Sequence, residues 1–255
     1  MDGALAVLNY NLIGYRRTWR GSAMSSFLLP VLFVLGFGIS VGSLVNTSRL
    51  GGESYLSFLV PGMIASTALQ VAFAEATWPV QSKFQWIRTY HSMIAAPLSI
   101  GDLVLGDMIF LVLRVVSSSA VFLVVTSLFG GVHSWWALAI LPATALLGVA
   151  VAAPVFAFSA TVKGSTNYFA FLQRFVVIPM SLFAGVFFPV SSLPIYFQPL
   201  AWVSPLWHGV ELCRAATHTD HGSMWAAVGH TAYLVLWAIV GLWLTARQFR
   251  RRLSD

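Results

Sequence analysis

The sequence predicts an all-α polytopic membrane protein, with six transmembrane helices, an N-terminal interfacial amphipathic helix and two short re-entrant helices before the last span. Of its 255 residues, 58% are hydrophobic and only 9% are charged, whereas soluble domains contain about 25% charged residues. The long apolar runs lack the alternation of barrel strands, and only helices satisfy their own backbone hydrogen bonds in lipid. A soluble enzyme and a disordered chain are therefore excluded. The single cysteine, Cys213, also excludes a disulfide-framed fold.

The positions of the charges predict the spans, because crossing a bilayer takes about 20 apolar helical residues. Five uncharged intervals reach that length, and the longest covers 48 residues from Val115 to Val162. A Gly-Gly break at 130–131 divides that interval in two. We expect spans at 25–46, 55–79, 102–128, 135–161, 168–188 and 223–246, within one transmembrane domain covering residues 1–255.

The Lys and Arg residues predict the orientation. Ten of them fall on one side of the predicted spans: Arg16, Arg17, Arg20, Lys83, Arg88, Lys163, Arg247, Arg250, Arg251 and Arg252. Only Arg49 and Arg214 fall on the other side. The positive-inside rule then places both termini, including a basic tail at 247–255, in the cytoplasm of a cell-membrane protein. The same distribution explains the net charge of +6 without a nucleic-acid partner.

Residues 1–21 have the pattern of an interfacial helix. Leu5, Leu8, Leu12 and Tyr15 recur at helical spacing on one face, which suits a helix lying among lipid headgroups. A lead-in to the first span is the alternative. The first apolar run is too long for the core of a cleavable signal peptide.

Residues 80–101 form the longest predicted cytoplasmic loop. Ser82 is placed to begin a short helix and Pro97 to end it. Six residues give this loop more aromatic bulk and positive charge than an idle loop needs: Lys83, Phe84, Trp86, Ile87, Arg88 and Tyr90. We expect them to dock a partner, with an interfacial anchor as the equal alternative.

Residues 189–222 are too apolar for water and too rich in proline to span the membrane. We expect two short helices, beginning near Pro194 and at Ser204-Pro205, that dip into the outer leaflet. The expected gate residues are Phe188, Pro189, Ser191, Pro194, Pro205, His208, Glu211 and Arg214. Irregular backbone at that depth is tolerated only where it is buried in protein or lines a cavity. The segment is therefore either the wall of a pathway or an inert plug.

Three ionisable residues fall inside spans: Glu75, Asp107 and Arg114. Such groups cost several kcal/mol unless they are paired or hydrated, so they are functional candidates. We expect Glu75 to pair with Arg114 and favour a structural ion pair, with a proton relay or substrate contact as the alternative. No P-loop motif, no zinc-protease spacing of histidines and no nucleophile cluster is present. The sequence thus predicts no catalytic or metal-binding residue.

Two segments resemble the type-2 permeases of ABC transporters. Residues 94–107 read IAAPLSIGDLVLGD, similar to the family's "TPLS" turn followed by "LLGK". Residues 185–194 read GVFFPVSSLP and residues 204–214 read SPLWHGVELCR, similar to the signature "FFPxSxLP…PLxHxVELxR". The resemblance covers essentially the whole chain and is nearest to the drug-exporter and nodulation-signal-exporter branch.

The resemblance implies a non-enzymatic permease that works with two separate ATPase subunits, which carry the ATP and Mg²⁺, and with a second permease. It implies that the loop around 83–92 docks on the ATPase and that 191–214 forms the re-entrant gate. Two departures favour a heterodimer with a sister permease: FQWIRT at 84–89 lacks the family's acidic residue, and Asp107 replaces a lysine.

The expected function is ATP-driven export of an amphipathic or lipid-like substrate, such as a drug or antibiotic, a glycolipid or a lipo-oligosaccharide. The alternative is a proton-coupled secondary transporter that uses Glu75, Asp107 and Arg114 as its relay.

Overall fold

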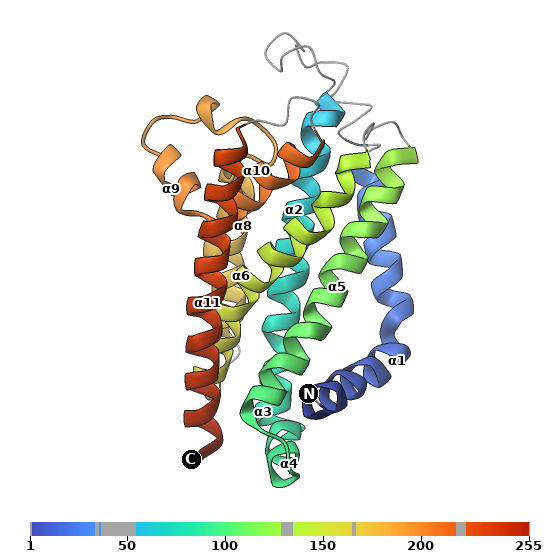
Figure 1. Ribbon diagram of the computed structural model, residues 1–255, viewed down its shortest axis with the longest axis vertical. Coiled ribbons are helices and arrows are strands. Elements are labelled where there is room, and N and C mark those ends of the chain that lie inside the picture. Colours follow the sequence, from blue (N-terminus) through green and yellow to red (C-terminus); the bar gives the residue numbers. More distant parts are fainter. Residues whose placement is uncertain are drawn as a thin grey trace.

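The computed structural model describes residues 2–33, 36, 55–128, 135–164, 167–217 and 223–254. Within these ranges the chain is helical and contains no strand, which confirms the all-α class. The long helices run side by side along the long axis of the molecule (Figure 1). Both termini lie toward the end that carries α3 and α4, which we call the basal end, whereas α9 and α10 lie at the opposite, distal end.

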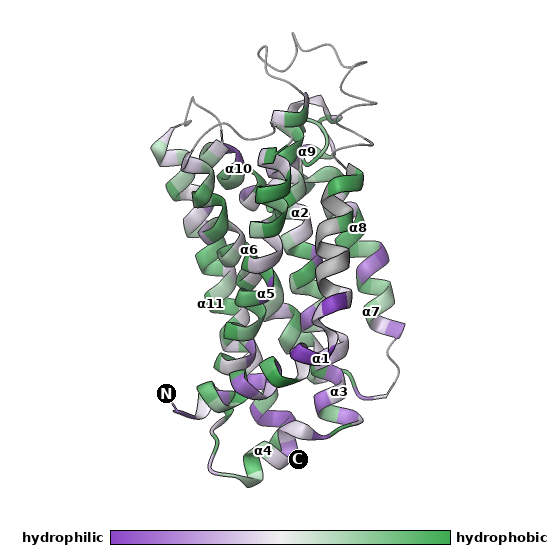
Figure 2. Ribbon diagram, turned by 90° about the vertical axis from the view of Figure 1, so that its right-hand side faces the viewer, coloured by the Kyte–Doolittle hydropathy of each residue, from purple (hydrophilic) through white to green (hydrophobic). Residues whose placement is uncertain are grey.

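Among the described residues, four helices are long and apolar enough to cross a membrane, and they coincide with four of the six predicted spans. They comprise α2 (Tyr55–Ala76) continued through α3 (Trp78–Gln85), α5 (Ile100–Leu128), the 3₁₀ turn η3 (Trp135–Ala139) continued by α6 (Ile140–Thr161), and α11 (Met224–Ser254). Figure 2 shows hydrophobic residues along these helices and hydrophilic residues gathered toward the basal end.

The first predicted span and the interfacial helix belong to one bent helix, α1 (Asp2–Phe33). The beginning of α1 lies across the basal end, and the remainder rises beside α5 (Figure 1). Helix α1 therefore continues without a break from the predicted interfacial segment into the first predicted span. The rest of the predicted span 25–46 falls beyond Phe33, largely outside the described residues.

The fifth predicted span, 168–188, is shorter and less regular than expected. It consists of α7 (Asn167–Leu172), a π-helical turn η4 (Gln173–Val177) and α8 (Ile178–Phe183), and it is not among the four candidate spans. The helix ends where Gly185 adopts the left-handed conformation at φ 79°, a common way to terminate a helix.

The last helix is longer than predicted. Span 6 was expected to end at 246 and to be followed by a basic tail, yet α11 continues to Ser254. Arg, Gln and Leu are strong helix formers, and Phe249 in this extension is fully buried. The tail is therefore a helical part of the basal end.

Small residues bring the long helices into close contact, as is usual between membrane helices. A Cβ atom on Gly241 of α11 would lie 2.6 Å from Cδ of Pro154 and 2.7 Å from Cβ of Ala153 in α6. A Cβ atom on Gly106 of α5 would lie 2.7 Å from the carbonyl oxygen of Ala4 in α1. These contacts fix α11 against α6 and α1 against α5.

The close approach at Gly241 predicts a stability loss on substitution. Gly241→Ala should destabilise the folded protein by about 1–3 kcal/mol, because the new methyl group overlaps Pro154 and Ala153. Gly229→Ala on the same helix meets open space and should leave stability unchanged or slightly higher. Thermal unfolding of the purified protein in detergent measures both variants, and equal melting temperatures would contradict the packing described here.

Candidate functional site

The segment 80–101 folds into two short helices rather than the single helix expected to begin at Ser82. Helix α3 ends at Gln85, α4 (Thr89–Ala95) begins after Arg88, and α4 ends before Pro97 as predicted. Ser82 lies inside α3, where its hydroxyl donates to the carbonyl of Pro79 (3.2 Å). Arg88 has φ 54°, a left-handed conformation that is uncommon for a residue with a side chain. This turn separates the two helices and creates a tip at 86–88.

The six residues expected to dock a partner divide into two groups. Trp86 and Ile87 are 62% and 64% exposed at the tip, and Arg88 is exposed beside them. Lys83, Phe84 and Tyr90 instead face into the bundle, and Phe84 and Tyr90 are almost completely buried. Of these six residues, the three at the tip are therefore the ones available for direct contact with another protein.

The inward-facing group surrounds the buried carboxylate of Asp107, which is 3% exposed. Its Oδ1 accepts hydrogen bonds from Nζ of Lys83 (2.6 Å) and from Nδ2 of Asn11 (2.7 Å). Its Oδ2 accepts one from the hydroxyl of Tyr90. Nζ of Lys83 also donates to Oδ1 of Asn11 (2.8 Å). This Asp107 cluster joins four helices, because its members lie on α1, α3, α4 and α5.

The protonation state of Tyr90 suits this arrangement. Burial raises the pKa of Tyr90 well above its usual value, and the neighbouring negative charge and hydrogen bond of Asp107 raise it further. The phenol thus keeps its proton and acts as a permanent donor to the carboxylate. Asn11 was not expected in this site from the sequence; the signal that could have found it is the requirement that an intramembrane carboxylate be paired.

An aromatic cluster lies directly beside the Asp107 cluster. The rings of Phe84 and Tyr90 are 4.6 Å apart, and Phe249 of α11 lies 4.9 Å from Phe84 and 5.3 Å from Tyr90. Edge-to-face pairs at these distances contribute about 0.5–1.5 kcal/mol beyond the area that they bury. Residues 80–101, called the coupling segment below, therefore pack on α11 as well as on α1 and α5.

Arg252 ties the same region to the end of α6. Nη1 of Arg252 donates to the carbonyls of Ser159 (3.1 Å), Ala160 (2.9 Å) and Val162 (2.7 Å), which are carbonyls at the C-terminal end of α6. Its guanidinium also lies 4.4 Å from the ring centre of Phe84. A positive charge at the C-terminus of a helix is stabilising. Arg252 thus connects α11, α6 and α3.

The expected ion pair between Glu75 and Arg114 is confirmed. Nε of Arg114 lies 3.0 Å from Oε1 of Glu75, and Nη1 donates to the hydroxyl of Tyr15 (2.7 Å). The pair links α2 to α5, and Tyr15 adds α1. Each of the three intramembrane charges is therefore engaged by side chains of this chain, which favours the structural interpretation over a relay.

The turn that resembles the family's "TPLS" motif has a clear local role. Ser99 and Asp102 form a capping box at the start of α5: the backbone N–H of Ser99 donates to Oδ2 of Asp102 (3.0 Å), and the N–H of Asp102 donates to Oγ of Ser99 (3.2 Å). Pro97 precedes this box. The motif therefore ends α4 and begins the third span within a few residues.

The described part of the predicted segment 189–222, residues 189–217, lies at the distal end and is called the distal segment. It contains two short helices, as predicted, but the first begins later than expected. A 3₁₀ turn η5 (Val190–Ser192) precedes α9 (Gln198–Val203), which starts with Pro199 in its first turn rather than at Pro194. Helix α10 (Pro205–Thr217) starts where predicted, and Oγ of Ser204 accepts a hydrogen bond from the N–H of Leu206 (3.2 Å). Phe188, Ser191 and Pro194 are exposed.

Two of the predicted gate residues on α10, His208 and Arg214, form hydrogen bonds to other elements. Nε2 of His208 lies 2.9 Å from the carbonyl oxygen of Trp202, and its Nδ1 lies 2.8 Å from Nδ1 of His230 in α11. A carbonyl can only accept, so Nε2 of His208 carries the proton and Nδ1 of a neutral His208 accepts from His230. The ring of Tyr233 stacks on His208 at 3.8 Å.

Arg214 holds α10 to the chain reversal after α8. It pairs with Glu211 (3.2 Å), donates to the carbonyl of Gly185, and lies 4.1 Å from the ring centre of Phe58 in α2. Among the residues that the structure describes, no group of three His, Cys, Asp or Glu side chains could hold a metal ion. The distal segment is thus a docked, hydrogen-bonded cap.

Comparisons with known proteins agree with these features. The profile of the family described as "ABC-2 type transporter" matches residues 4–217. The chain is 31% identical to Nodulation protein J of Rhizobium leguminosarum bv. viciae over 250 residues, which cover 98% of this chain and 94% of that protein. It is 32% identical to Nodulation protein J of Sinorhizobium fredii over 251 residues, covering 98% and 93%.

A more distant relative is the inner membrane transport permease YadH of Escherichia coli. It is 24% identical over 204 residues, which cover 75% of this chain and 73% of that protein. The family match includes both the basal coupling segment and the distal segment.

The Asp107 cluster predicts a stability loss that a second substitution partly reverses. Asp107→Ala should destabilise the protein by about 3–5 kcal/mol, because Lys83 is left in a mostly buried position without its counter-charge. The double variant Lys83→Met/Asp107→Leu should recover part of this loss, because it removes both charges but leaves the Tyr90 hydroxyl and the Asn11 amide without their acceptor. Thermal unfolding in detergent measures the cycle; an Asp107→Ala protein as stable as the parent would contradict the ion pair.

The histidine pair predicts loss of stability in acid. Burial lowers the pKa of His208 below its usual value, a shift only partly opposed by the bond to the Trp202 carbonyl. The unfolded chain therefore binds the proton first, so the stability from neutral His208 is complete above the usual histidine pKa of about 6.5 and is lost as the pH falls through the folded-state value.

The measurement is the melting temperature as the pH is lowered from about 7 to about 5. His208→Gln should flatten the decline, whereas His91→Gln, at an exposed position on α4, should leave it unchanged. The same slope in all three proteins would show that His208 does not carry the effect.

Proposed function

This chain belongs to the ABC-2 type transporter family, and we propose that it is the permease subunit of an ATP-driven exporter whose ATPase partner docks on the tip at 86–88. Membrane subunits of this family are transport components and are not catalytic by themselves. In this proposal two separate ATPase subunits bind ATP and Mg²⁺, and this chain converts their closure into a movement of its spans.

The observation that carries the proposal is the contrast between the tip and its base. Trp86 and Ile87 present exposed apolar surface next to Arg88, and Trp and Arg are enriched among the residues that dominate protein interfaces. The residues on either side, Phe84 and Tyr90, are fully packed. A partner therefore contacts a small exposed surface whose neighbouring residues are packed in the bundle, rather than a free loop.

The residues beside the tip connect it to the long helices, so that a movement of the tip can be transmitted to them. Lys83 and Tyr90 bind the carboxylate of Asp107 on α5, and Phe84 packs against Phe249 of α11. The contacts of Tyr90 and Phe84 are buried, and that of Lys83 is partly buried. A push on the tip would displace α5 and α11 together with the beginning of α1. Because close-packed interiors deform little, such a displacement passes along whole helices.

The same geometry bears on the second permease. Asp107 stands where the family has a lysine, and this difference suggested a sister subunit. Its negative charge is paired within this chain with Nζ of Lys83, which lies 2.6 Å from Oδ1 of Asp107. A complex with two copies of this chain is therefore as consistent with the structure as a heterodimer. The missing acidic residue of the coupling loop is the remaining argument for a sister permease.

The orientation in this proposal places the basal end in the cytoplasm of a cell-membrane transporter. Both termini and the tip lie at that end (Figure 1), and most of the Lys and Arg residues belong to it by sequence. The distal segment then faces outward as the gate at the end of the pathway, surrounded by membrane lipid.

For the cargo we propose an amphipathic, lipid-like molecule in the class of glycolipids and lipo-oligosaccharides. Two considerations support it: relatives over nearly the full chain are named Nodulation protein J, and the distal motif resembles the drug-exporter and nodulation-signal-exporter branch. Efflux of a hydrophobic drug or antibiotic is the other member of this class, and a transport assay with both kinds of cargo separates them.

The proposal predicts that an ATPase co-purifies with the chain and that the tip at 86–88 is the surface that binds it. A mild-detergent pull-down of tagged chain from its native membrane should recover ATP hydrolysis, and Trp86→Ala or Arg88→Glu should reduce the bound ATPase by about tenfold, as expected when an interface anchor is lost. Trp135→Ala, at an exposed position on η3, serves as the matched control.

Identification of the recovered proteins also shows whether the second permease is a copy or a sister. A chain that emerges without any ATPase, and whose transport collapses with the proton gradient while ATP is high, would favour the secondary-transporter alternative instead.

A further inference from the structure

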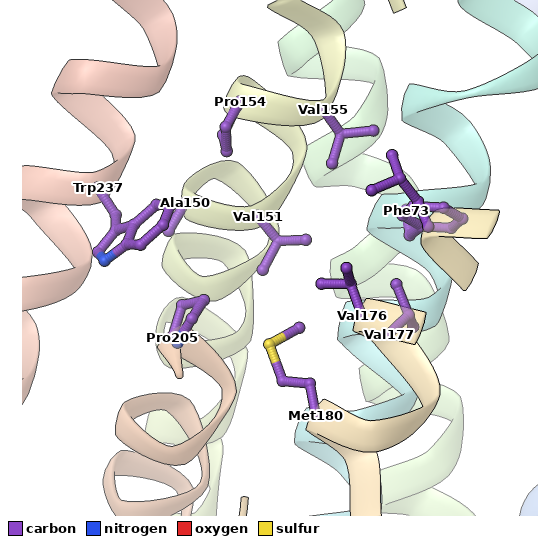
Figure 3. Close-up of a pocket in the computed structure, with 11 residues that line it drawn as sticks. Phe73, Ala150, Val151, Pro154, Val155, Val176, Val177, Met180, Pro205 and Trp237 are labelled. Carbon is purple, nitrogen blue, oxygen red and sulfur yellow. The ribbon is translucent and has the colours of Figure 1, made fainter. Parts of the chain in front are cut away.

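A cavity of about 150 Å³ lies among the helices of the bundle, away from the tip and next to the beginning of α10. Its walls come from α2, α6, α7, η4, α8, α10 and α11, and its lining is entirely apolar or aromatic. Figure 3 shows Val151, Val176 and Met180 pointing toward one another across the opening, with Phe73 and Trp237 at opposite sides. No polar side chain lines it.

The cavity lies beside the fifth predicted span, which contacts the rest of the bundle closely at Phe169 and lines the cavity after that residue. Phe169 of α7 is buried between Trp78 and Phe158, with ring centres 5.3 Å and 6.3 Å away. The π-helical turn η4 follows, and such turns change the register of side chains and recur at functional sites. On the opposite wall, Pro154 removes one backbone donor from α6.

Physical chemistry restricts what can occupy this space. A water molecule needs two to four polar partners, and an apolar cavity of this size stays dry. An empty cavity forfeits the dispersion contacts of its lining. The occupant that satisfies both conditions is a hydrocarbon chain, and the volume admits part of one chain rather than a headgroup or a ring system.

The position of the cavity relates it to transport. One wall is Pro205, the first residue of α10, so the cavity reaches the segment expected to form the gate. Another wall is η4, whose Phe175 is 64% exposed on the surface of the bundle. The cavity thus lies between an exposed apolar surface and the distal segment.

We propose that this cavity holds the hydrocarbon chain of the transported amphiphile while its polar part lies toward the distal segment. This inference rests on the proposed function and specifies the apolar half of the cargo. Val151, Val176 and Met180 would contact the chain, and the helix irregularities at η4 and Pro154 would let the walls separate to admit it.

The test uses the full transporter complex in lipid vesicles and a photoreactive probe, a hexadecyl glycoside with a diazirine in the middle of its chain. After irradiation, mass spectrometry should find the label on Val151, Val176 or Met180 in excess over Val124, an exposed residue of α5 outside the cavity. An excess of unlabelled glycoside should compete the cavity label but not the label on Val124.

Val151→Trp fills the cavity and should reduce the cavity label by about tenfold, since losing the burial of two methylene groups has that effect on affinity. Ala150→Leu is a smaller filling that should give an intermediate loss if Val151→Trp fails to fold. Val124→Trp, on the exposed face of α5, should change neither the labelling nor ATP hydrolysis.

Equal labelling of the cavity by a diazirine phospholipid, without competition by the glycoside, would overturn the assignment to cargo and show a bound membrane lipid. Unchanged competition by the glycoside in both filled variants would overturn the cavity as the site. Failure of the proposed function is distinguishable, because it would appear as the absence of a co-purifying ATPase from the unsubstituted chain.

Discussion

The carboxylate of Asp107 must be satisfied inside the bundle, and much of the basal architecture follows from that requirement. A charge at membrane depth is tolerated only when it is paired and hydrogen bonded, and the partners of Asp107 come from α1, α3 and α4. The segment between the second and third predicted spans is therefore folded back onto the bundle. Phe84, Phe249 and Arg252 add further buried contacts, and the tip at 86–88 stays exposed.

Polar side chains at the distal end are also paired, here mainly with backbone carbonyls. His208 and Arg214 place their polar atoms on backbone carbonyls and on neighbouring side chains, which allows a proline-broken segment to lie against the spans. Between these two ends, most contacts among the described helices are apolar and close, as at Gly241, and the Glu75–Arg114 pair adds a polar contact. The cavity beside η4 interrupts this close packing next to the distal end.

The sequence could predict what depends on local or one-dimensional signals. Charge spacing located four spans, the pairing of Glu75 with Arg114 followed from the cost of isolated charges, and Ser204-Pro205 marked the start of α10. The sequence could not reveal contacts that depend on tertiary packing. Lys83 lay in an expected surface loop, and Asn11 is 96 residues from Asp107, so neither carried a signal of the buried cluster. The extension of α11 likewise depends on the burial of Phe249.

The central claim is that nucleotide-driven movement of the tip reaches the distal end through the Asp107 cluster. Spin labels on cysteines introduced at Ile195 and Trp135, both exposed, can follow the distal end. Native Cys213 should not react, because burial raises the pKa of its thiol to about 12. The account predicts that a non-hydrolysable ATP analogue changes the distance between the labels in the intact complex but not in Lys83→Met/Asp107→Leu, which still binds the ATPase. An identical change in both complexes would contradict it.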